Sequence, residues 1–222
     1  MTWGVIIAAG GSGERFGDDK LFVTLGGMPL ISHAITLFGS LEPSVICVVA
    51  PAAKWPDVTH AAAAVGVEIA LAEGGSTRQE SVSNGLQKMG DVDLVVVHDA
   101  ARPLCPKSVV QAVIAAAQAT GAATAALPIV DALISAEAER MTGTVPRQGV
   151  YRVHTPQAFR RELLIEAHAS ATRLARTADD DAGLVAALGA EVALVPSDFH
   201  NVKVTYSRDL GYAEALLGVG HE

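Results

Sequence analysis

Short apolar runs alternate along the chain with longer stretches in which apolar residues recur every three or four positions. The short runs are rich in Val and Ile, which favours strands, and the longer stretches have the period of amphipathic helices. Strands are predicted over residues 2–7, 44–50, 67–72, 93–98, 122–127 and 191–195. Helices are predicted between them, over residues 28–41, 77–89 and 107–120.

This order predicts an α/β fold with a single doubly wound, mostly parallel sheet sandwiched by helices. No linker divides the 222 residues, so one domain is expected over residues 1–222. Residues 131–152 fit the alternation poorly and have weak β-character around a Gly-containing turn. They are expected to form an arm that leaves the core.

Ligands of such sheets bind at the carboxyl ends of the strands. The loops after the first, third and fourth predicted strands should therefore converge on one crevice. They are AAGGSGERFGDDK (8–20), EGGSTRQES (73–81) and DAARP (99–103).

Composition narrows the class of partner. The net charge of −8 argues against binding to nucleic acid or to an anionic membrane, since both need a cationic face. No secretory signal is evident, and no apolar run approaches the ~20 residues of a membrane span, so a soluble cytoplasmic protein is expected. Cys47 and Cys105 lack metal-ligand spacing and are expected to be reduced thiols, with Cys47 in the core.

The Gly-rich loop 8–20 suits a phosphate, because glycines after a strand let backbone N–H groups approach one closely. It matches neither common phosphate motif. The dinucleotide fingerprint fits at Gly11 and Gly13 but has Phe16 in third place, and the phosphate loop of ATPases needs Ser or Thr directly after Lys20. Two interpretations of the loop are left. It is either a turn that wraps a triphosphate, with Arg15 and Lys20 at its sides, or a solvated surface turn.

Five segments, in order, resemble the 2-C-methyl-D-erythritol 4-phosphate cytidylyltransferase family of the non-mevalonate isoprenoid pathway. They are AAGGSGERFGDDK, GGSTRQES, HDAARP, TPQAF and NVKVT. HDAARP with the downstream TPQ is the most specific part, and the resemblance covers nearly the whole chain. It implies that CTP and a polyol phosphate give a CDP-polyol and pyrophosphate, with Mg²⁺ on the triphosphate.

The resemblance also implies roles for individual residues. Arg15 and Lys20 would stabilise charge at the α-phosphorus, and Lys203 would position the acceptor. With Arg147, these residues form the expected catalytic set. The positions expected to contact CTP are Ala8, Ala9, Gly10, Gly11, Gly13, Gly75, Ser76, Ser81, Asp99 and Ala100. Those expected at the acceptor are Arg102, Arg147, Lys203, Ala132 and Asp179.

For Asp99, Ser76 and His98 the expected roles need a further comment. Asp99 would face the ribose or Mg²⁺, the latter held mainly by CTP. Ser76 also suits a helix cap, with Glu80 in the first turn. His98 is expected to be structural, because an acceptor phosphate is already ionised at neutral pH and needs no base.

The resemblance implies that the arm reaches a second subunit, so a homodimer is expected. The chain departs from the family pattern at Ala132 and Asp179, where Thr is usual, and at Asp19, where Pro is common. Either Thr177 replaces the second hydroxyl or the aspartates 179–181 cap the next helix. A ribitol-5-phosphate cytidylyltransferase, a nicotinamide-dependent dehydrogenase and a CTP-binding regulator without activity remain as alternatives.

Overall fold

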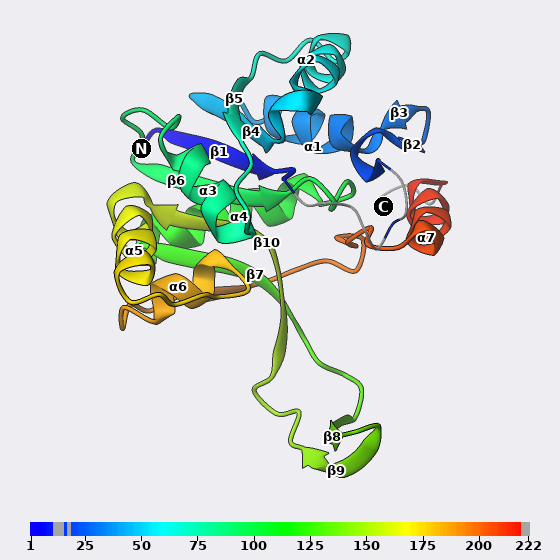
Figure 1. The fold of residues 1–222 in the computed structure, drawn as a ribbon, viewed down its shortest axis with the longest axis vertical. Helices are drawn as coiled ribbons and strands as arrows, with labels where there is room; N and C mark the ends of the chain where they lie inside the picture. Colours follow the sequence, from blue (N-terminus) through cyan, green and yellow to red (C-terminus); the bar gives the residue numbers. More distant parts are fainter. Residues whose placement is uncertain (11–15, 17–18, 219–222) are drawn as a thin grey trace.

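A seven-stranded sheet forms the centre of the computed structural model, which describes residues 1–10, 16 and 19–218 (Figure 1). The strand order across the sheet is β11-β7-β10-β6-β1-β4-β5. The strands are β1 (Trp3–Ala8), β4 (Val45–Ala50), β5 (Ala70–Glu73), β6 (Leu94–Asp99), β7 (Ala122–Pro128), β10 (Tyr151–Arg160) and β11 (Ala193–Pro196). All pair in parallel except β10, so the predicted mostly parallel sheet is confirmed.

Strand β10 was not predicted from the pattern of apolar residues. It runs antiparallel between β6 and β7 and carries the motif TPQAF in its second half. Pro156 is the second residue of this motif, and Pro is rare inside a central strand because it cannot donate a ladder hydrogen bond. The register accordingly shifts between Val153 and Gln157.

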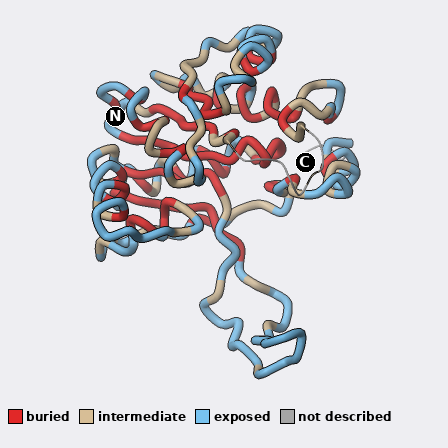
Figure 2. Tube along the Cα trace, viewed as in Figure 1, coloured by how far each residue is buried: buried red, intermediate tan, exposed pale blue. Residues whose placement is uncertain are grey.

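Alternation along β1 explains why helices cover both faces of the sheet. Val5 and Ile7 belong to one buried cluster, and Ile6 belongs to another. The first cluster includes residues of α1 (Leu30–Gly39), α2 (Trp55–Ala64) and α4 (Lys107–Thr120). The second includes residues of α3 (Arg78–Leu86), α5 (Arg161–Arg173) and α6 (Asp181–Ala186). Figure 2 shows the buried chain running through this central layer.

A smaller apolar cluster anchors the C-terminal part of the chain beside the sheet. It joins Leu25 and Leu30 to Val204 and Ala213, the last of which lies in α7 (Ser207–Gly218). Leu25 ends β2 (Thr24–Leu25), which pairs with β3 (Met28–Pro29) after the short helix η1 (Lys20–Phe22). Since Val204 also donates its N–H to Ala101 O at 2.8 Å, the segment containing Lys203 is held against the end of β6.

The arm is a hairpin of β8 (Leu133–Glu137) and β9 (Arg140–Val145) that extends away from the body (Figure 1). Its turn is formed by Ala138 and Glu139, which have φ values of 45° and 63°. The expectation of a Gly-containing turn was therefore wrong: Gly143 pairs with Ser135 inside the hairpin. No helix in the described part of the chain is long and apolar enough to cross a membrane.

Gly85 gives a test of how closely α3 packs on the sheet. A Cβ atom there would lie 2.8 Å from Ile6 Cγ2 and 2.9 Å from Val49 Cγ2. Gly85→Ala should therefore lower the free energy of unfolding by ~1–3 kcal/mol, although Ala is the better helix former. Urea denaturation measures the change. The matched control is Gly211→Ala in α7, where nothing lies within 4 Å and a gain of ~0.5–1 kcal/mol is expected; a loss in both variants would contradict this account.

Candidate functional site

Loops at the carboxyl ends of β1, β5 and β6 converge as predicted. Ala100 donates its N–H to Ala8 O at 3.0 Å, which joins the end of β6 to the end of β1. A Cβ on Gly10 would lie 2.9 Å from Ser81 Oγ, so the first loop passes directly against the start of α3. Only a glycine fits this approach without displacing Ser81.

Hydrogen bonds shape the loop that leads into α3. Thr77 is the N-cap, since its side chain accepts from Glu80 N at 3.0 Å; the interpretation of Ser76 as the cap was wrong. Ser76 instead donates from N and Oγ to Glu80 Oε2, at 2.7 and 2.6 Å, and these bonds lower the pKa of the Glu80 carboxyl. Ser81 Oγ accepts from Gly75 N at 3.0 Å. The predicted CTP-contacting residues of this loop therefore belong to one hydrogen-bonded turn.

Asp99 lies at the centre of the site, at the last position of β6. Its Oδ1 accepts from Arg78 Nε at 3.2 Å, and its Oδ2 accepts from Lys203 Nζ at 2.7 Å. Its side chain is 11% exposed, and its N–H donates to Thr155 Oγ1 at 3.0 Å. Residues from three separate parts of the chain thus meet at one buried carboxylate.

The charge of Asp99 is fixed by these neighbours. Burial alone would raise the pKa of its carboxyl, but the positive charges of Lys203 and Arg78 lower that pKa well below its usual range. Asp99 is therefore ionised at neutral pH and cannot act as a general acid. Its chemical capacity is to accept hydrogen bonds, to pair with cations or to bind a metal.

Arg78 was not among the predicted functional residues, although it lies in the segment GGSTRQES. It occupies the first position of α3, where a cation meets the positive end of the helix dipole and needs compensation. Asp99 supplies part of it, and Asp181 supplies the rest through Oδ2, 2.6 Å from Arg78 Nη1. Burial lowers the pKa of Arg78, but Asp181 and Asp99 reverse this, so the pKa is raised overall. The sequence did contain a signal for Arg78, because a basic residue in the first turn of a predicted helix is unfavourable unless a carboxylate compensates it.

Arg102 is a second buried cation beside this centre, 7% exposed. Its Nη1 donates to Asn201 O at 2.7 Å, and its buried Nε has no hydrogen-bond partner among the described residues. Burial lowers the pKa of its guanidinium. Within the described chain no carboxylate lies at ion-pair distance from Arg102, so its charge is available to an anion.

His98 has the structural environment expected of it. The ring is fully buried, contacts the Phe38 ring edge-on at 5.1 Å between centroids, and lies 3.1 Å from Arg102 O through Nε2. Its Nδ1 lies 3.2 Å from Thr155 Oγ1. Burial lowers the pKa of His98 to about 4, which makes the ring neutral near pH 7.

The structure describes only some of the remaining predicted residues. Gly11, Gly13 and Arg15 fall outside the described residues. Lys20 begins η1, directly after Asp19, whose carboxylate pairs with Lys54 at 2.7 Å. In the arm region, Ala132 and Arg147 are both exposed, and an Arg147 N–H donates to Val130 O. The structure thus brings Lys203, Arg102 and Asp99 together but does not bring the arm residues of the same chain to them.

The three aspartates at the start of α6 have different positions. Asp179 is exposed, whereas Asp180 caps the helix by accepting from Gly183 N at 2.7 Å, as the capping interpretation predicted. Asp181 is 1% exposed and pairs inward with Arg78 and His168. The contact of this run with Arg78 therefore comes from Asp181, two residues beyond the predicted Asp179.

Mg²⁺ can be tested against the donors present. Among the described residues no group of three or more His, Cys, Asp or Glu side chains could form a metal cage. Mg²⁺ on a nucleotide needs only one or two carboxylates besides phosphate oxygens. Asp99 fits that smaller requirement, because among the described residues Oδ2 bonds only to the half-exposed ammonium of Lys203.

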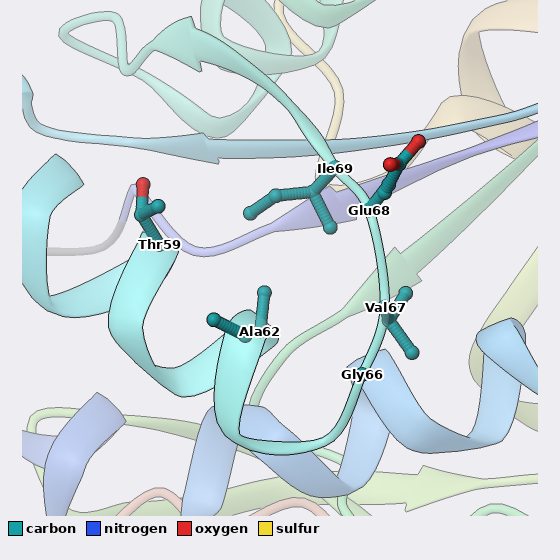
Figure 3. A pocket seen from close by; sticks show the side chains of 7 residues that line it. Thr59, Ala62, Gly66, Val67, Glu68 and Ile69 are labelled. Atoms are coloured by element: carbon teal, nitrogen blue, oxygen red, sulfur yellow. The ribbon is translucent and has the colours of Figure 1, made fainter.

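A separate hollow of about 440 Å³ lies between α2 and the segment that precedes β5 (Figure 3). It is at the amino end of β5, whereas the Asp99 cluster is at the carboxyl ends of the strands. Its lining residues include no Lys or Arg, so it is unsuited to a triphosphate. They are Thr59, Ala62, Ala63, Gly66, Val67, Glu68 and Ile69.

Comparison with known proteins agrees with this geometry. The family model described as "IspD: 2-C-methyl-D-erythritol 4-phosphate cytidylyltransferase" matches residues 3–219. The 2-C-methyl-D-erythritol 4-phosphate cytidylyltransferase of Deinococcus radiodurans is 42% identical over 214 residues, covering 96% of this chain and 88% of that protein. The crystal structure of the enzyme of that name from Thermus thermophilus has a TM-score of 0.80 at 36% identity, covering 96% of this chain and 98% of that one. The crystal structure of a 4-diphosphocytidyl-2C-methyl-D-erythritol synthase has a TM-score of 0.82 at 29% identity, with 97% and 98% coverage.

The buried ring of His98 predicts a pH dependence of stability. In the unfolded chain a histidine takes up a proton below about pH 6.5, whereas folded His98 resists protonation until about pH 4. Over this interval the unfolded state binds more protons, so the contribution of His98 to stability falls as the pH falls, by ~1.4 kcal/mol per pH unit. NMR titration should place the His98 midpoint near pH 4, and urea denaturation should show the decline. A His98 midpoint near pH 6.5 would contradict the prediction.

Proposed function

Because this chain belongs to the 2-C-methyl-D-erythritol 4-phosphate cytidylyltransferase family, we propose that the site around Asp99 carries out the reaction of that family. The chain is a nucleotidyltransferase that moves a cytidylyl group from CTP to 2-C-methyl-D-erythritol 4-phosphate. The products are 4-diphosphocytidyl-2-C-methyl-D-erythritol and pyrophosphate. The observation that supports this site is the meeting of Arg78, Arg102 and Lys203 around one buried carboxylate.

The proposed reaction needs no nucleophilic side chain. An oxygen of the acceptor phosphate attacks the α-phosphorus of CTP, and the bond from that phosphorus to the departing pyrophosphate breaks. Two anions approach one another, so fixed cations are the main requirement. Arg15 and Lys20 fill this role at the triphosphate, while Arg102 and Lys203 hold the acceptor phosphate.

The nucleotide is proposed to lie along the converging loops. The backbone of Ala8, Ala9 and Gly10 borders it, and the turn of Gly75, Ser76 and Ser81 contacts the cytosine and ribose. Asp99 and Ala100 lie beside the ribose at the end of β6. Mg²⁺ is the proposed cofactor. Asp99 and the CTP phosphates would hold it, and it would offset negative charge on the triphosphate.

Lys20 provides the direct test of this function. Lys20→Ala should lower kcat by ~10²–10³, because removal of one preorganised charge costs ~2.7–4 kcal/mol of barrier, and should affect CTP affinity less. Pyrophosphate release from CTP and Mg²⁺ is measured with methylerythritol phosphate, and ribitol 5-phosphate is run in parallel. Lys107→Ala, which removes an exposed ammonium bonded to Ser40 O, is the matched control and should retain activity. Pyrophosphate release with ribitol 5-phosphate but not with methylerythritol phosphate would identify ribitol 5-phosphate as the acceptor.

We also propose that the arm joins two chains into a homodimer and carries Arg147 to the partner's acceptor site. The support is an exposed hairpin with large apolar side chains, in which Arg147 lies apart from Lys203 of its own chain. Val130, Ile134 and Met141 are 61%, 57% and 59% exposed. Apolar surface of this kind is typical of an interface.

Charge placed on the hairpin should separate the subunits. Ile134→Glu combined with Met141→Glu should convert a dimer to a monomer in analytical ultracentrifugation, because each carboxylate would be buried without a partner. The monomer should keep its fold and lose most of its turnover. Leu174→Glu is the control, since Leu174 is equally exposed, at 59%, but lies at the end of α5. A wild-type chain that sediments as a monomer would contradict the dimer.

A further inference from the structure

A chain of polar contacts, with ion pairs from Asp181 to Lys203 and a hydrogen bond between His168 and Asp181, reaches from the proposed site into the layer of α5 and α6, which pack against one another (Figure 1). We define it as the ionic chain, made of His168, Asp181, Arg78, Asp99 and Lys203. Its successive distances are 2.9, 2.6, 3.2 and 2.7 Å. We propose that Asp181 and His168 are positioning residues for cytidylyl transfer, acting through Arg78 on the Asp99–Lys203 pair. This inference rests on the proposed function.

The geometry of Arg78 connects the two halves of the ionic chain. Its Nη1 donates to Asp181 and its Nε donates to Asp99. Because a guanidinium is planar and its N–H directions are fixed, the contact with Asp181 sets the direction of the contact with Asp99. Asp99 in turn holds the Lys203 ammonium, so a displacement of Asp181 would be transmitted to the cation at the acceptor.

The burial of Asp181 is greater than a helix start requires. Its side chain is 1% exposed, and that of His168 is 5% exposed. Asp180 already caps α6, so Asp181 is not needed for that purpose. Burial would raise the pKa of Asp181, but the hydrogen bond from His168 and the charge of Arg78 lower it, so the carboxylate stays ionised.

Stability alone does not account for this arrangement. A buried ion pair pays a desolvation penalty, and apolar residues of similar volume often stabilise a fold as well or better. The buried, ionised Asp181 is therefore best explained by its contact with Arg78. Arg78 stands at the positive end of the α3 dipole, and without Asp181 only Asp99 would compensate its charge.

The test compares two adjacent aspartates. Asp181→Asn keeps the shape of the side chain and removes its charge, and it should lower kcat at least tenfold with a change in the KM for CTP below threefold. Asp180→Ala removes the cap of the same helix, and it should lower the urea midpoint while kcat stays at the wild-type value. Circular dichroism verifies that each variant is folded under assay conditions.

A second measurement detects the ionic chain without turnover. Urea midpoints are compared for Asp181→Asn, Lys203→Met and the double variant, and the loss in the double variant should be smaller than the sum of the single losses. Wild-type kcat in Asp181→Asn, or additive midpoint losses, would overturn the proposal. A wild-type protein without turnover would count against the proposed function. The urea midpoints would still show whether Asp181 and Lys203 are coupled.

Discussion

The interaction on which the site depends is the pairing of the Asp99 carboxylate with cations from distant parts of the chain. Asp99 stands at the end of the central strand β6, Arg78 begins α3, and Lys203 follows the last strand. Anionic substrates require concentrated positive charge, yet an uncompensated cluster of buried cations would oppose folding. One ionised carboxylate resolves this conflict, because it holds Arg78 and Lys203 in place, while Arg102 beside it has no carboxylate at ion-pair distance within the described chain.

The fold makes this meeting possible through the order of its strands. β1 and β6 are neighbours, so their carboxyl ends bring Ala8 beside Ala100, and the loop after β5 reaches the same edge through α3. Thr155 of antiparallel β10 accepts a hydrogen bond from the backbone of Asp99. The hydrogen bond from Val204 N to Ala101 O holds the neighbouring Lys203 close to the end of β6. The acidic protein thus gathers Arg78, Arg102 and Lys203 at one edge of the sheet, which explains how a net charge of −8 is compatible with anionic substrates.

The alternation of apolar runs was sufficient to predict the parallel strands, three of the helices and the convergence of their loops, because these depend on local periodicity. It could not predict β10, since Pro156 argues against a strand and only the surrounding strands hold it in the sheet. The prediction placed the cap at Ser76, one position before Thr77, because Ser and Thr are both common capping residues and the pattern does not fix a helix boundary to one residue. The link of Arg78 to Asp181 escaped prediction for another reason: the two residues are far apart in the sequence, and no periodicity relates them. Motif resemblance, not residue pattern, carried the assignment of Lys203 and Arg102.

The central claim is that Asp99 organises the cations of the site by charge. The most direct measurement is the kinetics and CTP affinity of Asp99→Asn, which keeps the size of the side chain and removes its charge. The account predicts a folded protein with kcat lowered by about 10²-fold or more because Lys203 is released, and with a CTP affinity that changes less than kcat. A kcat within threefold of the wild type would contradict it.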